Sequence, residues 1–393
     1  MTDFFSRIFW TLSIALFLIV GCKPTEQPAP QPDYFVFVGT YTKGNSEGIY
    51  VYRLNMETGS LTYVNKATGI RNPSFLALDS SYSYLYAVGE TDEFNGQMGG
   101  SVHAYRIDHA TGALTALNSQ PSGGVAPCYI SLDHSGKWLM TANYGGGNLM
   151  IYPIGADGNI GSPADTAQHA GQGPNPDRQQ APHAHSILTD PTNSRVFAAD
   201  LGIDQLVVYQ LDQAKGQLQP DSSLFIRAEP GAGPRHFEFH PNGQLLFVIN
   251  ELNSSISSYR YDPNTGTTSL VETVSTLPAD FTENNTCADI HLSPDGKFVY
   301  GSNRGHNSIV AFTVDATTGK MTYVSHTPTQ GETPRNFGMD PTGKYLLVAN
   351  QNTENVLVLQ RDSNTGMLTP VGQPVNIPMP VCLKFMPVPA QPN

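Results

Sequence analysis

The chain has 393 residues, of which 14% are charged, and it is rich in Gly (37) and Pro (30). A formal net charge of −12 disfavours a general role on nucleic acid or on anionic lipid, because both need a basic surface. The composition suits many short strands joined by tight turns and argues against a helical protein. A small anionic substrate is still possible, since a few local arginines can bind one.

The N-terminal segment has the features of an export signal. The segment from Ile8 to Val20 is almost wholly apolar. Its length is about that of a signal-peptide core and is too short to span a bilayer comfortably. It ends in Ile19-Val-Gly-Cys22, which resembles a bacterial lipobox. The sequence therefore predicts a signal peptide over residues 1–21 and lipidation of Cys22. A plain secretory signal with a chance cysteine is the alternative.

The next segment is rich in proline. Lys23 to Asp33 reads KPTEQPAPQPD, as expected for a tether behind a lipid anchor, so we expect a tether over residues 22–33. The predicted location is the bacterial cell envelope, periplasmic or on the outer surface, with membrane contact through the lipid anchor only. The other cysteines form no evident disulfide framework and are expected to be small buried thiols: Cys128, Cys287 and Cys382.

An internal repeat follows over residues 34–388, before a short tail at 389–393. One copy runs from Ala126 to Pro153 and another from Gly233 to Tyr259. Each copy has a short alternating strand, a turn, an apolar strand, a second turn and a third strand rich in β-branched and aromatic residues. Repeats of this kind are typical of a β-propeller.

A turn marker gives the number of repeats. An Asp or Asn opens this turn and a Gly follows four residues later, as a tight hairpin requires sterically. Six copies and one degenerate copy predict seven four-stranded antiparallel blades: 55–59, 108–112, 155–158, 212–216, 262–266, 315–319 and 362–366. Tyr34 to Leu54 lacks a preceding inner strand and Met379 to Met386 lacks followers, so pairing the two would close the ring. An open array or two smaller propellers is the alternative.

Polar residues gather where the repeats should meet. In an antiparallel blade, the start of the inner strand and the end of the second strand lie at the same end of the sheet. At these positions the blades differ from one another and carry many polar or titratable residues, as a site on a symmetric scaffold should. They are Ser74, Glu90, Cys128, Asn143, Tyr144, His185, Asp200, Arg235, Asn250, Glu251, Ala288, Asn303, Arg304, Arg335, Asn350 and Gln351.

These residue types could open a lactone. His185 or Glu251 could activate water, and the arginines could stabilise the developing oxyanion or clamp an acidic group. Structural alternatives stay open, because Glu251 could simply neutralise Arg235 and Arg304 could bond a neighbouring loop. The pair His183 and His185 could be read as part of a metal site, but no further ligand is identifiable, so neither metal nor cofactor is expected.

The segments Gly233-Pro-Arg-His236, Asn250-Glu251, Pro182-His-Ala-His185 and Ser302-Asn-Arg304 resemble those of the seven-bladed lactonase family. That family includes bacterial 6-phosphogluconolactonases and the fungal carboxy-cis,cis-muconate cyclase. The resemblance implies an all-β, seven-bladed propeller with catalytic roles for His185, Arg235, Glu251 and Arg304. We also expect His183, His236, Arg335 and Asn336 to bind substrate.

The expected activity is metal-independent hydrolysis of a small-molecule lactone that bears an acidic or phosphorylated group. The phosphogluconolactonases act on a cytosolic sugar phosphate, which an exported protein would rarely meet. The resemblance therefore supports lactonase chemistry better than that particular substrate. The alternative is a non-catalytic envelope propeller that uses the same rim to bind a sugar acid, a peptide or a protein partner.

Overall fold

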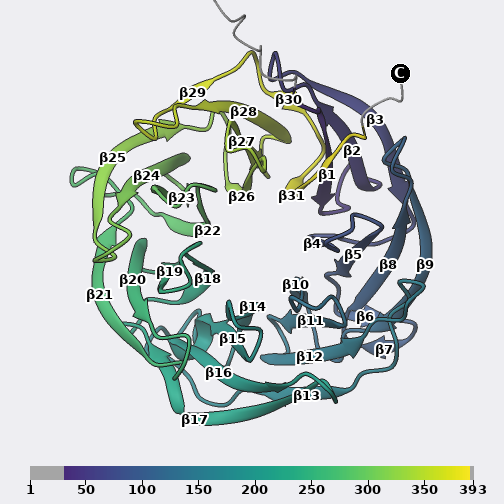
Figure 1. The fold of residues 1–393 in the computed structure, drawn as a ribbon, viewed down its shortest axis with the longest axis vertical. Helices are drawn as coiled ribbons and strands as arrows, with labels where there is room; N and C mark the ends of the chain where they lie inside the picture. Colours follow the sequence, from purple (N-terminus) through teal and green to yellow (C-terminus); the bar gives the residue numbers. More distant parts are fainter. Residues whose placement is uncertain (1–30, 390–393) are drawn as a thin grey trace, which may run out of the picture. The chain divides into compact units, whose positions relative to one another are not determined.

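The repeated strands form seven β-sheets that surround a central channel (Figure 1). The computed structural model describes residues 31–389. The innermost strands line the channel and each sheet extends outward from it. The innermost strands of the blades, in ring order, are β31 (Pro380–Pro387), β4 (Leu76–Leu78), β10 (Pro127–Leu132), β14 (Ala184–Thr189), β18 (Pro234–Phe239), β22 (Thr286–Leu292) and β26 (Pro334–Met339).

The outer strands follow each inner strand in chain order, except in blade 1. They are β1 (Tyr34–Thr40), β2 (Gly48–Leu54) and β3 (Leu61–Thr68) in blade 1; β5 (Tyr84–Gly89), β8 (Ser101–Ile107) and β9 (Leu114–Pro121) in blade 2; β11 (Trp138–Asn143), β12 (Asn148–Pro153) and β13 (Asp165–Gln168) in blade 3; β15 (Arg195–Asp200), β16 (Gln205–Asp212) and β17 (Gln217–Arg227) in blade 4; β19 (Leu245–Asn250), β20 (Ser255–Tyr261) and β21 (Thr268–Ser275) in blade 5; β23 (Phe298–Arg304), β24 (Ser308–Val314) and β25 (Met321–Pro328) in blade 6; and β27 (Tyr345–Asn350), β28 (Asn355–Arg361), β29 (Leu368–Pro370) and β30 (Val375–Asn376) in blade 7.

The two ends of the propeller meet in blade 1. Strand β1 is entirely buried and pairs antiparallel with β31, with Val36 opposite Phe385 and Val38 opposite Leu383. The C-terminal strand therefore supplies the inner edge of a sheet whose other strands come from the N-terminal side. The predicted seven-bladed fold and its mode of closure are both confirmed.

The turn between the third and fourth strands works as its sequence predicts. In blade 2, Asp108 Oδ1 accepts from the backbone N–H groups of Ala110 and Thr111, and Gly112 has a φ of +66°. The same turns also join adjacent blades. Tyr86 donates its hydroxyl to the carbonyl of Gly158, and Tyr300 does the same to Gly366. The recurring turn thus serves two purposes, reversing the chain and docking each blade on its neighbour.

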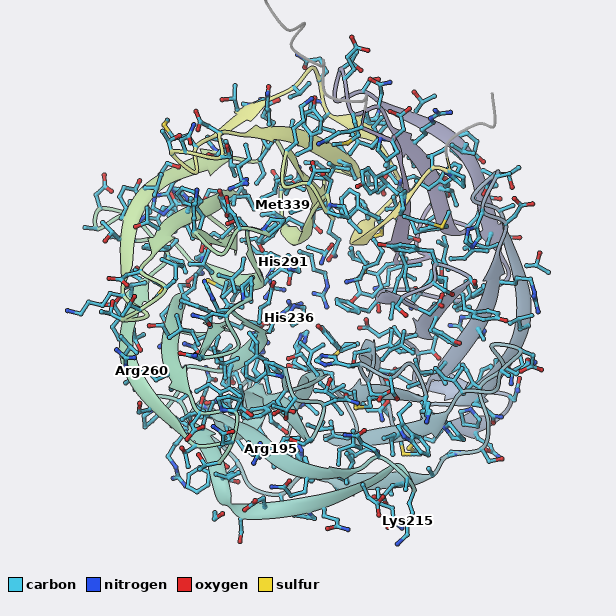
Figure 2. All side chains as sticks on the ribbon, viewed as in Figure 1. Arg195, Lys215, His236, Arg260, His291 and Met339 are labelled. Carbon is cyan, nitrogen blue, oxygen red and sulfur yellow. The ribbon has the colours of Figure 1, made fainter. Side chains whose placement is uncertain are left out.

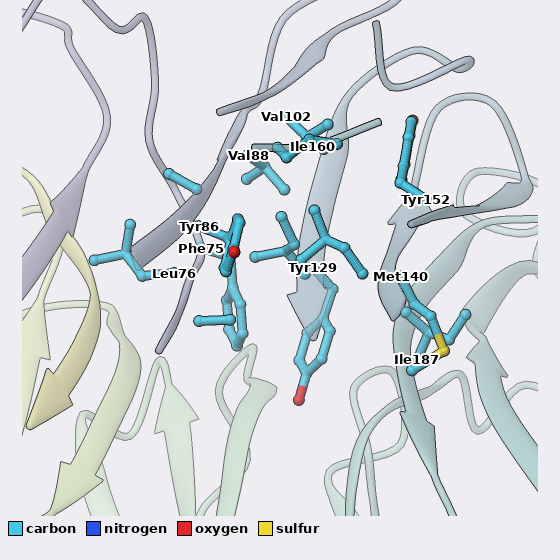
Figure 3. Packing of buried hydrophobic residues seen from close by; sticks show 14 of the residues in the cluster. Phe75, Leu76, Tyr86, Val88, Val102, Tyr129, Met140, Tyr152, Ile160 and Ile187 are labelled. Carbon is cyan, nitrogen blue, oxygen red and sulfur yellow. The ribbon is translucent and has the colours of Figure 1, made fainter. Parts of the chain in front are cut away.

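Apolar side chains fill the space between neighbouring sheets. Around blades 2 and 3, Tyr86, Tyr152 and Met140 are fully buried, and Phe75 stacks on Tyr129 with ring centroids 4.1 Å apart (Figure 3). Burying one such large side chain contributes about 1.5–3 kcal/mol. The ring is therefore held by packing between sheets, which gives a rigid frame for the residues at its channel.

Two blades depart from the simple repeat. Blade 2 carries an inserted hairpin of β6 (Glu93–Phe94) and β7 (Gln97–Met98) between its second and third strands. In blade 7 the outermost strand is divided, because β29 and β30 each pair with a different part of β28. Neither departure was predicted, since the repeat alignment shows where strands recur but not what connecting segments form.

The predicted signal peptide, Cys22 and nearly all of the predicted tether lie outside the described residues. Between residues 31 and 389, no helix is long and apolar enough to cross a membrane. In the same part of the chain the three remaining cysteines are free and buried, as predicted.

Candidate active site

A β-bulge at the start of the inner strand brings consecutive side chains to the channel. In blade 5 the pairing register shifts between Pro234 and His236, so that Arg235 is the extra residue. Consecutive residues of a regular strand point to opposite faces, but a bulge changes the direction of a side chain. Arg235 and His236 consequently line one cavity together. The same shift occurs in blades 3, 4 and 7, around Cys128, His185 and Arg335.

Three arginines surround the carboxylate of Glu251, which follows β19. Arg178 Nη2 lies 2.6 Å from Oε1, while Arg235 Nε and Arg304 Nη2 lie 3.0 and 2.9 Å from Oε2. The three come from a loop before blade 4, from the inner strand of blade 5 and from the second strand of blade 6. Both Glu251 and Arg235 are almost completely buried. This cluster of four side chains is called the arginine–glutamate cluster below.

The cluster fixes the charge of its members. Burial alone would raise the pKa of Glu251, but Arg304, Arg235 and Arg178 together lower it to about 2. Burial and the charges of Arg304 and Arg335 lower the pKa of Arg235 to about 10. Near neutral pH the carboxylate is therefore ionised, and it accepts a hydrogen bond from Arg178 and forms ion pairs with Arg235 and Arg304.

His185 lies beside this cluster. It is buried, and its ring lies 5.2 Å from that of His236 and 5.5 Å from that of Tyr144, measured between centroids. Burial, followed by the positive charge of Arg235, holds the pKa of His185 well below its usual range. His183 lies further out, where its ring stacks on Tyr144 at 4.5 Å and Nδ1 donates to the Tyr144 carbonyl. His185 is thus a neutral imidazole next to several cations.

Arg335 lies near the start of β26 in blade 7 and lines the same cavity as Arg235. Its guanidinium lies over the ring of Tyr41, 5.3 Å from the centroid, and the Tyr41 hydroxyl donates to Glu90 with both carboxylate oxygens at 3.0 Å. Among residues 31–389, no hydrogen bond or ion pair engages the guanidinium of Arg335. It is therefore held in place by an aromatic ring while its N–H groups are available to a ligand.

Side chains at the starts of the inner strands, together with Glu90, enclose a cavity of about 10 Å³, which has room for about one water molecule. A larger molecule would have to lie above it, at the mouth of the channel. The groups that line the cavity come from five blades and include an acid, two guanidinium groups, an imidazole and a thiol: Ser74, Phe75, Glu90, Cys128, Arg235, His236, Arg335, Asn336 and Val381.

The site is positively charged although the protein is acidic. Arg178, Arg235, Arg304 and Arg335 face the carboxylates of Glu90, Glu251 and Asp289, which leaves an excess of one positive charge. The whole chain carries a formal charge of −12. An anion near this surface is therefore drawn to the mouth of the channel. Among the described residues, no group of three or more His, Cys, Asp or Glu side chains is arranged to hold a metal ion.

The structure brings together the four residues predicted to be catalytic. Arg235, Glu251 and Arg304 are in direct contact, and His185 is their neighbour through His236. The structural alternative for Glu251 also describes a real contact, because Arg235 pairs with Glu251. Arg304 donates at 2.7 Å to the carbonyl of Cys287 in β22 of its own blade, rather than to a neighbouring loop.

The residues predicted to bind substrate fall into two groups. His183 and Arg335 offer groups at the mouth of the channel. The amide of Asn336 is already used, since Nδ2 donates to Asp289 and Oδ1 accepts from the backbone N–H of Leu383 at 2.8 Å. His236 belongs to neither group, because it is buried and yet lines the cavity.

Sequence reasoning missed Arg178 and Asp289. Arg178 lies in the segment between β13 and β14, the longest connection between successive blades, and its length was the available signal. When the inner strands are aligned, Asp289 lies one residue after the position that Arg235 and Arg335 occupy in their blades. It therefore corresponds to His236 in blade 5 and Asn336 in blade 7. The bulge turns the side chains at this second position toward the channel, and no residue spacing in the sequence reveals where a bulge occurs.

Comparisons with known proteins agree with this geometry. The family model described as a lactonase with a 7-bladed β-propeller matches residues 35–385. The chain belongs to this family. The 6-phosphogluconolactonase of Bacillus subtilis is 40% identical over 353 residues, covering 90% of this chain and 98% of that protein. The 6-phosphogluconolactonase of Formosa agariphila is 36% identical over 312 residues, covering 77% of this chain and 85% of that protein.

Among solved structures of the lactonase family, the periplasmic gluconolactonase of Pseudomonas aeruginosa is similar over the whole propeller. It is 33% identical with a TM-score of 0.86, and the match covers 91% of this chain and 100% of that one. The prediction of a seven-bladed lactonase family member is therefore confirmed.

Proposed function

We propose that this lactonase hydrolyses a lactone that carries an acidic group, with water as the nucleophile. The observation that carries the proposal is the arginine–glutamate cluster, buried beside a neutral histidine at a positively charged channel mouth. Water attacks the lactone carbonyl, the carbonyl oxygen becomes an oxyanion, and the ring oxygen leaves with a proton. These steps need a proton acceptor and fixed positive charge near the oxyanion.

In this proposal His185 accepts the proton from water, and Glu251 holds the arginines. His185 is neutral near pH 7 and its Nδ1 contacts the thiol of Cys128 at 3.7 Å, whereas Glu251 is surrounded by three guanidinium groups. The position of Glu251 fixes Arg235 and Arg304 before the reaction begins. Prepositioned charge of this kind stabilises a transition state without the cost of reorganisation.

Arg235 and Arg304 are proposed to stabilise the oxyanion, while Arg335 is proposed to bind the acidic group of the substrate. The separation of roles follows from their contacts. Arg235 and Arg304 share Glu251, whereas the guanidinium of Arg335 lies over the ring of Tyr41. The relatives that are named for 6-phosphogluconolactone and gluconolactone indicate a sugar-acid lactone as the substrate class.

A lactone panel tests the proposal. Initial rates of acid release in a pH-stat should show hydrolysis of 6-phosphoglucono-δ-lactone or of a carboxylate-bearing lactone above the spontaneous rate, and slower hydrolysis of unphosphorylated glucono-δ-lactone. Arg335→Ala should reduce the preference for the phosphorylated over the unphosphorylated sugar lactone by about tenfold or more. If no lactone is turned over but sugar acids bind in an Arg235-dependent way, the protein is a binding module and the proposal is wrong.

The cellular location is a separate proposal. We propose that the chain is exported and held in the envelope through a lipid on Cys22. It is supported by the apolar segment from Ile8 to Val20, the lipobox-like Ile19-Val-Gly-Cys22 and the periplasmic location in the name of one relative. Mass spectrometry of the mature N-terminus should show an acylated Cys22, and Cys22→Ser should release the protein from the membrane fraction. An unmodified Cys22 would contradict it.

A further inference from the structure

A second buried histidine next to the cluster, His236, has a carboxylate partner. His236 Nδ1 lies 2.7 Å from Asp289 Oδ1. Its other ring nitrogen, Nε2, lies 3.3 Å from Arg235 Nη1. Both His236 and Asp289 are nearly inaccessible to solvent, and in Figure 2 His236 points toward the centre of the ring.

The partners of His236 define its tautomer. A guanidinium can only donate hydrogen bonds, so Nε2 must accept the bond from Arg235. An ionised carboxylate can only accept, so Nδ1 must carry the proton that is donated to Asp289. The ring is therefore neutral, with its proton on Nδ1 and its lone pair directed at Arg235.

Asp289 is itself fixed from several sides. Its Oδ2 lies 3.2 Å from His291 Nε2 and accepts from the amide of Asn336, and its Oδ1 accepts from the backbone N–H of Ile290 at 3.0 Å. His291 Nδ1 in turn lies 3.0 Å from Glu238 Oε2. Because both partners of His291 are carboxylates, it carries protons on both nitrogens and is a cation. Asp289 is thus a rigid, ionised acceptor.

The contacts form a chain that ends at a proposed catalytic group. Arg235 is anchored at Nε by Glu251 and at Nη1 by His236 and the Ala288 carbonyl. We propose that Asp289, by keeping His236 in the Nδ1–H tautomer, positions the guanidinium of Arg235 for the reaction. His236 and Asp289 are positioning residues in this account, and His236 does not exchange a proton with the substrate. The inference rests on the proposed function of Arg235.

The charge of His236 also affects the position of Arg235. It is faced by Arg235 from β18, Asp289 and His291 from β22, His185 from β14 and Tyr129 from β10. Burial and the charge of Arg235 lower its pKa to about 4 against the opposing effect of Asp289. Protonation would convert Nε2 into a donor that repels Arg235, so the chain should come apart in acid.

Two substitutions separate positioning from proton transfer. A glutamine at this position can accept from Arg235 and donate to Asp289 without titrating, whereas a leucine can do neither. We expect His236→Gln to keep kcat/KM on the best lactone of the panel within about fivefold, and His236→Leu to lower it about 30-fold or more, mainly through kcat. The acid limb of the pH–rate profile that belongs to His236, near pH 4, should be absent in His236→Gln.

The alternatives give different results. If both variants lose activity to the same large extent while remaining folded, His236 transfers a proton and the positioning account is overturned. If both keep full activity, His236 has no part in the reaction, which also overturns it.

A measurement on the unaltered protein covers the case in which His236→Leu does not fold. In ¹⁵N-histidine-labelled protein at pH 7, the signals assigned to His236 through their loss in His236→Gln should show a protonated Nδ1 and an unprotonated Nε2. A proton on Nε2 overturns the inference. This spectrum is independent of any lactone, so a protein that hydrolyses no lactone but shows the Nδ1–H tautomer contradicts the proposed function and not the contact chain.

Discussion

At the residue scale, we expect Glu251 to contribute to both stability and the proposed function. It is 3% exposed and contacts three arginines, one of which, Arg235, is 2% exposed. Removing one partner of a buried charged pair leaves the other charge uncompensated, which costs about 3–5 kcal/mol. Glu251→Gln should therefore lower the free energy of unfolding by about 3 kcal/mol and kcat/KM by about 10²-fold, since the arginines lose their anchor.

Urea unfolding and initial rates measure both effects of Glu251→Gln. Arg260→Ala, on the exposed outer part of β20, serves as the matched control and should change neither quantity appreciably. A glutamine variant of full stability that is nevertheless inactive would instead indicate that Glu251 acts as the base.

The ion pair of His291 and Asp289 predicts a pH-dependent stability. Burial would lower the pKa of His291, but its contacts with Asp289 and Glu238 raise it to about 10, compared with 6.5 for the free side chain. A raised folded-state pKa gives stability that is complete below pH 6.5 and is lost as the pH rises through about 10. Because 30% of the side chain is exposed, we expect a loss of only about 2 kcal/mol.

Urea unfolding at a series of pH values between 6 and 10.5 tests this expectation. His291→Gln should lack the decline that the unaltered protein shows, so the difference between the two isolates the contribution of this histidine. Parallel curves for both proteins would contradict it.

At the element scale, the critical feature is the pairing of β31 with β1. Deleting residues from Met379 onward would expose the edge of β1 and remove Leu383 and Phe385, which pack with the strands of blades 1 and 7. We expect the shortened chain to lose cooperative thermal unfolding. Deleting only the predicted tail, residues 389–393, is the control and should leave the transition unchanged.

A permuted chain shows whether pairing or chain order matters. Tyr34 lies opposite Pro387 in the register, so residues 379–388 can be joined ahead of Tyr34 through a short Gly-rich turn. The permuted chain should regain cooperative unfolding. A truncated chain that melts like the complete one would show that the ring is closed by other contacts.

At the scale of the whole molecule, the fold could be predicted from the sequence because it is repetitive. Turns such as Asp108 to Gly112 recur at a constant place in each repeat, and their steric requirements are local. Much of the candidate site followed from the same symmetry, since inner-strand starts such as His185 and Arg235 must converge on one channel mouth.

What could not be predicted depends on contacts that no repeat pattern contains. The register shift between Cys287 and Ile290 determines that Asp289 faces the channel, and the conformation of a long loop determines that Arg178 reaches Glu251. The insertion of β6 and β7 is a similar case. These features depend on the packing of distant segments, whereas strand and turn patterns are local properties of the chain.

The central claim is that the arginines at the channel mouth catalyse lactone hydrolysis, and Arg235 tests it most directly. The measurement is kcat/KM for 6-phosphoglucono-δ-lactone, by pH-stat, in the unaltered protein, Arg235→Ala and Arg260→Ala. We predict that Arg235→Ala lowers kcat/KM by about 10²-fold or more while the circular dichroism spectrum is unchanged, and that Arg260→Ala stays within about twofold. Equal rates for all three proteins would contradict the account.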